Sequence, residues 1–201
     1  MRLILIRHAE SNANVKKVLG NHRSRLSKKG IIQARKLGMR LKNEKIDAVF
    51  SSRYKRAAET ARLLCELHKP KINHITFVAE AKERNYGKFE GKPHKHFIEE
   101  REKSGKHWHL FRPDGGENYS DITKRAKKFY AMLRKTYAGK TVVIVSHDVF
   151  NRVLISHILK KPLSHAAGLW QGNACMNVID VRNDADRKAK LIAINDTKHL
   201  C

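Results

Sequence analysis

Short apolar runs alternate with amphipathic stretches along the chain. The first run, Leu3 to Ile6, is purely aliphatic, as is typical of a strand buried on both faces. We predict further strands at 47–52, 75–78, 141–145, 177–181 and 191–194, and helices at 31–41, 56–67, 121–136 and 149–159. Because strands alternate with helices, the pattern predicts an α/β fold, a three-layer α/β/α sandwich with a mostly parallel sheet.

Residues 80–119 break this pattern. The segment holds Gly87, Gly91, Gly105, Gly115 and Gly116, two of the four prolines and both His-x-His pairs of the chain. Such a composition is typical of an excursion from the core and not of a regular layer element. We therefore expect one domain over residues 1–201 with a small inserted cap at about 80–119.

Polar side chains follow three of the predicted strands. Arg7 and His8 follow the first strand, Ser52 leads from the second towards Arg56, and His147 follows the strand at 141–145. The carboxyl ends of parallel strands share one edge of a sheet, where ligands bind. Arginine binds phosphate bidentately and stays charged. The sequence therefore predicts a phosphate-binding pocket at this edge.

The charge of the chain is strongly positive. It carries 43 Lys+Arg against 19 Asp+Glu, a net charge of +24, and it is 41% hydrophobic, which excludes a disordered composition. A field of this sign attracts phosphorylated substrates and also predicts weak, salt-dependent binding of nucleic acid. A general enrichment in lysine on solvent-facing positions is the alternative interpretation.

The cysteines and apolar runs indicate a cellular location. Cys65, Cys175 and Cys201 are odd in number, lie far apart and form no CxxC motif, so we expect reduced thiols. We find no signal-peptide pattern and no apolar run near membrane-spanning length. We therefore expect a soluble cytoplasmic protein without a membrane segment.

Six short motifs occur in an order that resembles the histidine phosphatase superfamily, which includes the cofactor-dependent phosphoglycerate mutases. Each motif is weak by itself, but together they span nearly the whole chain. They are residues 7–11 (RHAES) with Asn14, 51–61 (SSRYKRAAETA), 83–91 (ERNYGKFEG), 115–117 (GGE), 145–147 (VSH) and 195–200 (NDTKHL).

The resemblance implies phosphoryl transfer through a phosphohistidine on His8. Glu83 would protonate the leaving group and then activate water. The phosphate oxygens would be held by the catalytic residues Arg7, Arg56 and His147, with Ser11, Asn14, Gly20 and Asn21 as substrate-binding residues. The expected substrate is a small phosphorylated molecule. No metal or cofactor is expected, because the arginines supply the positive charge.

The chain departs from the family pattern at several positions. Ala9 and Asp148 stand where glycine is usual, and Asp148 is therefore a second candidate for the proton donor. Arg23 and Arg25 stand where an acidic residue and a proline are expected. These arginines would suit a substrate with more than one phosphate, or they are solvated loop charges.

The cap contains two His-x-His pairs, at 94–96 and 107–109, that resemble metal ligands in spacing. No carboxylate or cysteine stands at a supporting spacing, which argues against a metal site. We expect Trp108 and Phe111 to form the apolar underside of the cap.

Hydrolysis is favoured over two alternatives. Phosphoglycerate mutases resemble the chain but have a longer cap with an Arg-Arg pair, whereas the segment 90–114 is short and lacks that pair. Its layout is similar to that of broad-specificity, ribazole and fructose-2,6-bisphosphate phosphatases. The third interpretation is a polyanion-binding protein that has kept the fold and lost the reaction, against which the complete set of predicted catalytic residues argues.

Overall fold

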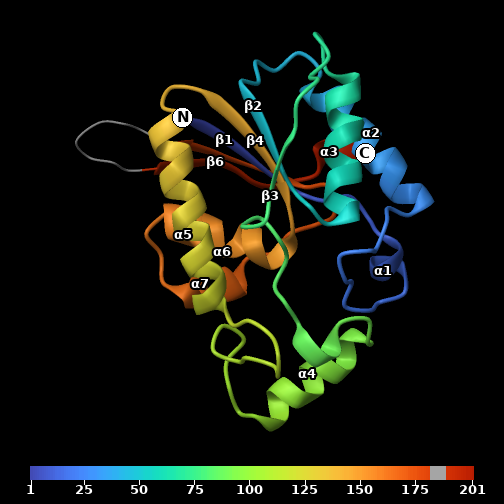
Figure 1. Ribbon diagram of the computed structural model, residues 1–201, viewed down its shortest axis with the longest axis vertical. Coiled ribbons are helices and arrows are strands. Elements are labelled where there is room, and N and C mark those ends of the chain that lie inside the picture. Colours follow the sequence, from blue (N-terminus) through green and yellow to red (C-terminus); the bar gives the residue numbers. More distant parts are fainter. Residues whose placement is uncertain (182–188) are drawn as a thin grey trace.

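A six-stranded sheet forms the centre of the protein, with strand order β3-β2-β4-β1-β5-β6. The computed structural model describes residues 1–181 and 189–201 (Figure 1). The strands are β1 (Arg2–Arg7), β2 (Ala48–Ser52), β3 (Thr76–Val78), β4 (Thr141–Ser146), β5 (Met176–Val181) and β6 (Ala189–Asp196). β1 to β4 pair in parallel, whereas β5 and β6 add an antiparallel edge. The predicted mostly parallel α/β sheet is confirmed.

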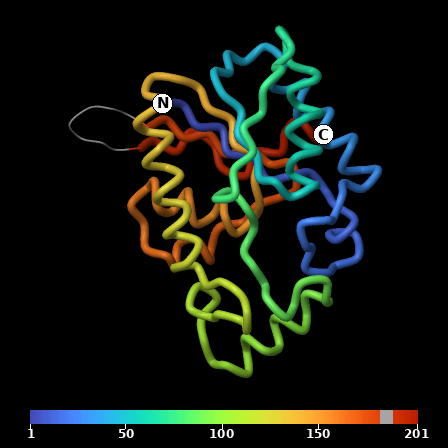
Figure 2. The backbone as a smooth tube through the Cα atoms, viewed as in Figure 1, coloured from blue at the N-terminus to red at the C-terminus, as the bar shows by residue number. Residues whose placement is uncertain are grey.

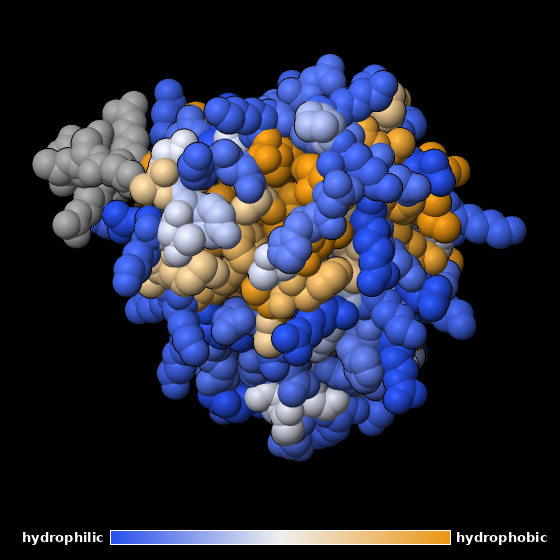
Figure 3. All heavy atoms as spheres, turned by 45° about the horizontal axis from the view of Figure 1, so that its top comes forward, coloured by the Kyte–Doolittle hydropathy of each residue, from blue (hydrophilic) through white to orange (hydrophobic). Residues whose placement is uncertain are grey.

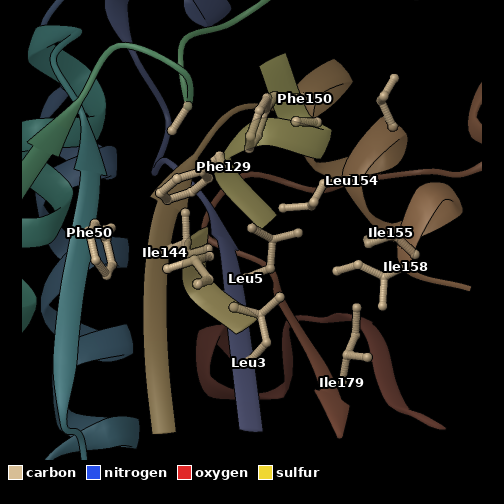
Figure 4. Packing of buried hydrophobic residues seen from close by; sticks show 14 of the residues in the cluster. Leu3, Leu5, Phe50, Phe129, Ile144, Phe150, Leu154, Ile155, Ile158 and Ile179 are labelled. Carbon is tan, nitrogen blue, oxygen red and sulfur yellow. The ribbon is translucent and has the colours of Figure 1, made fainter. Parts of the chain in front are cut away.

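Helices cover both faces of the sheet (Figure 1). α2 (Lys28–Leu41) and α3 (Lys55–Leu67) pack on one face, and α5 (Tyr119–Thr136), α6 (Asp148–Ile158) and α7 (Leu163–Gly168) on the other. In Figure 4, Leu3 and Leu5 of β1 face the α6 residues Leu154 and Ile155. Alternate residues of β1 enter opposite cores, with Ile4 and Ile6 on the α2–α3 side, so the strand is buried on both faces as predicted.

Two large apolar residues of these helices are exposed. Ile31 of α2 is 42% exposed and Met132 of α5 is 38% exposed. In α2 the buried stripe begins at Gly30, because a Cβ there would lie 1.9 Å from the Glu10 carbonyl oxygen. This close approach of two backbones turns Ile31 outwards.

The chain leaves the sheet after β3 and returns at α5, as Figure 2 shows for the green and yellow part of the tube. This segment carries η1 (Gly87–Phe89) and α4 (His94–Lys103) outside both layers. α4 lacks a visible apolar pattern because it buries only Phe97, which packs in a separate cluster with Leu19, Phe89 and Phe111. Trp108 packs against this cluster. The division of the chain into one domain with an inserted cap stays a prediction.

Hydrophilic side chains predominate on the face of the protein that Figure 3 shows. In Figure 3 they surround a smaller apolar area on the visible face. None of the helices in the described part of the chain is long and apolar enough to cross a membrane.

Candidate active site

Three parallel strands end side by side and bring the predicted site residues to one edge. Arg7 at the end of β1 is in register with Ser146 at the end of β4, and β2 ends next to β4 at Ser52. The residues that follow β1 and β4 are His8 and His147. Their rings lie edge to face with 5.1 Å between centroids.

The hydrogen bonds of His8 define one neutral tautomer. Its Nδ1 lies 2.7 Å from the carbonyl oxygen of Ala9, which only accepts, so Nδ1 carries the proton. Its Nε2 accepts a 3.0 Å bond from Nε of Arg56 and therefore carries the lone pair. Burial lowers the pKa of His8 well below its ordinary value, and the charges of Arg56 and Arg7 lower it further. The ring is thus a neutral base with its lone pair on Nε2.

The two arginines are fixed from behind by backbone carbonyls. Arg56, in the first turn of α3, donates through Nη1 to the Asn21 carbonyl at 2.7 Å. Arg7 donates through Nη1 to the Gln171 carbonyl, and its buried Nε has no partner among the described residues. Nη2 of each arginine makes no hydrogen bond within the described chain and is free for an oxyanion.

His147 lies behind His8 and is completely buried. Its Nε2 is 2.9 Å from the Ser52 hydroxyl, and the Tyr54 ring packs against it with 5.2 Å between centroids. Burial lowers its pKa well below the ordinary value, with the charge of Arg56 as the next cause. Unlike the other predicted catalytic residues, His147 does not line the cavity in this structure.

Glu83 reaches the site from the irregular segment between β3 and η1. Its Oε1 accepts backbone N–H bonds from Arg84 at 2.8 Å and Val149 at 3.2 Å. Burial raises the pKa of Glu83, and the nearby charge of Asp148 raises it further, against the opposing effects of the Arg84 backbone N–H bond and of the charge of Arg56. The carboxyl group therefore keeps a proton at a higher pH than an ordinary glutamate.

Asp148 also lines the cavity, but both of its carboxylate oxygens are engaged. They accept from Nε and Nη2 of Arg152 at 2.6 and 2.8 Å. Protonation of Asp148 would give up this bidentate ion pair. The geometry therefore favours Glu83 over Asp148 as the group that exchanges a proton.

The segment after β1 forms one wall of the site. Ser11 caps the short helix α1 (Asn12–Val15) and exchanges hydrogen bonds with Asn14, and both residues line the cavity. Gly20 lines it too, where a Cβ would come within 2.8 Å of the Ala13 Cβ. A larger residue would therefore displace this wall.

The side chains of residues 21 to 25 lie away from the cavity. Asn21 contributes its carbonyl to Arg56, while its side-chain oxygen accepts from the backbone N–H of Arg23 at 2.9 Å. Arg25 lies 3.4 Å from Glu59, and neither arginine lines the cavity. Arg23 and Arg25 are exposed loop charges in this structure.

The cavity has a volume of about 860 Å³, in the range typical of small-molecule sites. The floor holds Arg7, His8, Arg56 and Glu83. The walls and mouth add residues from the α1 segment, α4, the α6 start and the α7 end, among them Lys16, Lys17, Lys95, Trp108 and Trp170. The space is therefore larger than one phosphate group requires.

Arg125 is a site residue that the sequence did not reveal. It donates to the carbonyls of Lys82 at 2.8 Å and Glu83 at 3.2 Å, and it pairs with the Glu117 carboxylate at 3.1 Å. It therefore holds the backbone that carries Glu83. In the sequence Arg125 is one of several basic residues in α5. The only signal for a role in the site is that it stands eight residues after Glu117 of the 115–117 motif.

Comparisons with known proteins show the family of the chain. A sequence model of the histidine phosphatase superfamily (branch 1) matches residues 3–196. The adenosylcobalamin/alpha-ribazole phosphatase of Salmonella typhimurium is 32% identical over 189 residues, which cover 90% of this chain and 91% of that protein. Phosphoserine phosphatase 1 of Hydrogenobacter thermophilus is 30% identical over 205 residues, which cover 100% and 94%.

A solved structure gives the same result. The alpha-ribazole phosphatase from Shigella flexneri superimposes with a TM-score of 0.85 at 27% identity, covering 98% of this chain and 97% of that chain. The chain belongs to the histidine phosphatase superfamily, branch 1, as its six motifs predict.

Proposed function

We propose that the protein is a metal-independent phosphomonoester hydrolase that forms a phosphohistidine at Nε2 of His8. The observation that carries the proposal is the pair of hydrogen bonds on this ring, which leaves Nε2 unprotonated beside Arg56. Family membership supports the reaction class. The individual roles of the site residues are part of the proposal.

In the first step, Nε2 of His8 attacks phosphorus and the bond from phosphorus to the ester oxygen breaks. Before this attack, Arg56 must turn its Nε donor from the ring to a phosphate oxygen, which frees the lone pair of Nε2, and Arg7 and His147 assist in holding the phosphoryl group. Glu83 gives its proton to the leaving oxygen. The ring gains positive charge, which the Ala9 carbonyl stabilises through the Nδ1 proton.

In the second step, water attacks the phosphohistidine in place of the departed alcohol. The Glu83 carboxylate takes a proton from that water, the P–N bond breaks, and His8 returns to its neutral form. Inorganic phosphate leaves with Glu83 protonated again. Both steps balance without a metal ion, since Arg7 and Arg56 offset the charge of the phosphoryl oxygens.

Hydrolysis is supported better than either alternative. The relatives described above are named phosphatases, and none of them supports a mutase. A protein that only binds polyanions would gain nothing from a neutral His8 ring beside two fixed arginines, because a neutral ring adds no positive charge. We therefore take release of inorganic phosphate as the reaction.

The substrate that we propose is a small phosphorylated molecule, in agreement with the names of the two curated relatives. A cytoplasmic location remains part of the proposal. It is supported by three free cysteines, of which Cys65 and Cys175 are buried with their pKa raised to about 11. Weak binding of nucleic acid stays a prediction from the net charge alone.

The test is hydrolysis of p-nitrophenyl phosphate by the wild type and by His8→Ala. We expect turnover that survives EDTA and disappears in the variant. Rapid acid-free quenching with labelled substrate should trap a phosphoryl group that is stable in alkali and labile in acid, as expected for phosphohistidine.

His74→Ala is the matched control, because His74 is an exposed histidine that does not line the cavity. It should keep both turnover and labelling. Full activity in His8→Ala, or loss of activity in EDTA that added metal restores, would refute the proposal.

A further inference from the structure

The mouth of the cavity carries more positive charge than the reacting phosphate needs. Lys16 and Lys17 follow α1, and Lys95 lies in the first turn of α4. All three line the same cavity as His8 and Arg56. They come from two segments that are separated by more than seventy residues in the sequence.

Backbone hydrogen bonds hold these two segments together. The N–H of His94 donates to the Lys17 carbonyl at 3.1 Å, and the N–H of Leu19 donates to the Lys92 carbonyl at 2.9 Å. Val18 and Pro93 form an isolated antiparallel bridge between them. The lysines of both segments therefore share one rim of the cavity as a built feature of the fold.

The other charged groups of the cavity already have partners. Of its two acidic residues, Asp148 pairs with Arg152, and Glu83 accepts two backbone N–H bonds. Arg84 donates to the carbonyls of Phe111 and Glu117.

The three lysines differ from these groups, because none forms an ion pair with a residue in the described part of the chain. Their ammonium groups remain available to a ligand.

We infer that the site selects phosphomonoesters that carry a second phosphate, which Lys16, Lys17 and Lys95 bind at the mouth while Arg7 and Arg56 hold the reacting one. The inference rests on the proposed function and adds the substrate class. Lysine suits this task as a mobile point charge with three donors. A dianionic phosphate attracts the ammonium groups more strongly than a carboxylate with one charge.

The experiment compares kcat/KM within matched substrate sets at low ionic strength. The sets are fructose 6-phosphate with fructose 1,6-bisphosphate, adenosine 5′-monophosphate with adenosine 3′,5′-bisphosphate, and glycerol 3-phosphate with 3-phosphoglycerate and 2,3-bisphosphoglycerate. In at least one set we expect a preference of about tenfold for the bisphosphate, beyond the factor of about two from its two ester groups.

The variants separate local binding from the general field of a basic protein. Lys16→Glu/Lys95→Glu should lower the bisphosphate preference about tenfold. Lys28→Glu/Lys103→Glu changes the net charge equally on exposed lysines outside the cavity and should lower it less than about twofold.

Three results would overturn the inference. They are no bisphosphate preference in any set, an equal loss in both double variants, or a preference for 3-phosphoglycerate as large as that for 2,3-bisphosphoglycerate. Turnover of p-nitrophenyl phosphate is measured in parallel. If it persists while the preference is absent, the second-phosphate site fails and the phosphatase reaction stands.

Discussion

The Nε atom of Arg56 donates a 3.0 Å hydrogen bond to Nε2 of His8. The guanidinium therefore touches the atom that we propose as the nucleophile and keeps it unprotonated in two ways. It donates to the lone pair, and its charge adds to burial in lowering the pKa of the ring. The same side chain is anchored through Nη1 to the Asn21 carbonyl, so its guanidinium is held beside His8 before substrate arrives.

Replacement of Arg56 by lysine should therefore be costly although the charge is kept. A single ammonium group cannot contact the Asn21 carbonyl and a phosphate oxygen in the same fork geometry. We expect kcat for p-nitrophenyl phosphate to fall by about two to three orders of magnitude. Arg53→Lys, three residues earlier on an exposed turn, should stay within about twofold of the wild type. Equal kcat values for the two variants would contradict the role of Arg56.

The sequence predicts the part of the site that depends on buried strands. The aliphatic runs of β1 and β4 indicate strands buried on both faces, and parallel pairing then places His8 and His147 next to each other. The motif resemblance adds Glu83, which lies in an irregular segment where no periodicity applies. His8 and His147 could be predicted from the strand pattern and the sheet topology, and Glu83 from a local sequence motif.

Contacts to backbone carbonyls could not be predicted in this way. Arg125 donates to the backbone carbonyls of Lys82 and Glu83, and Asn21 acts through its own carbonyl, so the side-chain type of the accepting residue carries no signal in either case. The position of α4 could not be predicted either, because one buried residue, Phe97, sets it. Because the position of α4 was unknown, the sequence suggested Arg23 and Arg25 as extra cations near the site. In the structure the cavity is lined by Lys16 and Lys95 instead.

Arg125 should act as a positioning residue for Glu83. Arg125→Lys would release at least one of the carbonyls of residues 82 and 83, so the carboxyl group would lose its fixed position. A displaced general acid matters most for leaving groups that need a proton. We expect the rate of the first phosphoryl transfer to fall about tenfold to a hundredfold for an alkyl phosphate such as glycerol 2-phosphate.

The p-nitrophenolate leaving group departs without a proton, which provides the internal control. The burst of p-nitrophenol should change less than about threefold in Arg125→Lys. Arg134→Lys on the same helix α5 should alter neither rate. If Arg125→Lys slows both substrates equally, the residue has only a structural role.

The pH profile should report the raised pKa of Glu83. Because the protonated form is the acid, kcat for an alkyl phosphate should fall as the pH rises through this pKa. The charge of Asp148 contributes to the rise, so Asp148→Asn should move this alkaline limb to lower pH. Glu83→Gln should remove the limb together with most of the activity. Retention of the limb in Glu83→Gln and its loss in Asp148→Asn would make Asp148 the proton donor instead.

Stability should fall in mild acid because of the two buried histidines. The pKa values of His8 and His147 are well below the ordinary value in the folded protein, so below about pH 6.5 the unfolded chain takes up protons that the folded one does not. Unfolding is then favoured progressively as the pH falls towards the folded pKa values. Each histidine should cost about 1 kcal/mol between pH 6.5 and 5.5, and the raised pKa of Glu83 opposes part of this loss.

Urea unfolding at pH 7.5, 6.5 and 5.5 in phosphate-free buffer measures this loss. His147→Gln removes one titrating ring, so its stability should depend on pH less steeply than that of the wild type, by about 1 kcal/mol over the last pH unit. His96→Gln removes an exposed histidine of α4 and should keep the wild-type dependence. Identical slopes for wild type and His147→Gln would mean that His147 binds a proton equally well in the folded and unfolded states. That result would contradict the conclusion that His147 is uncharged in the folded protein.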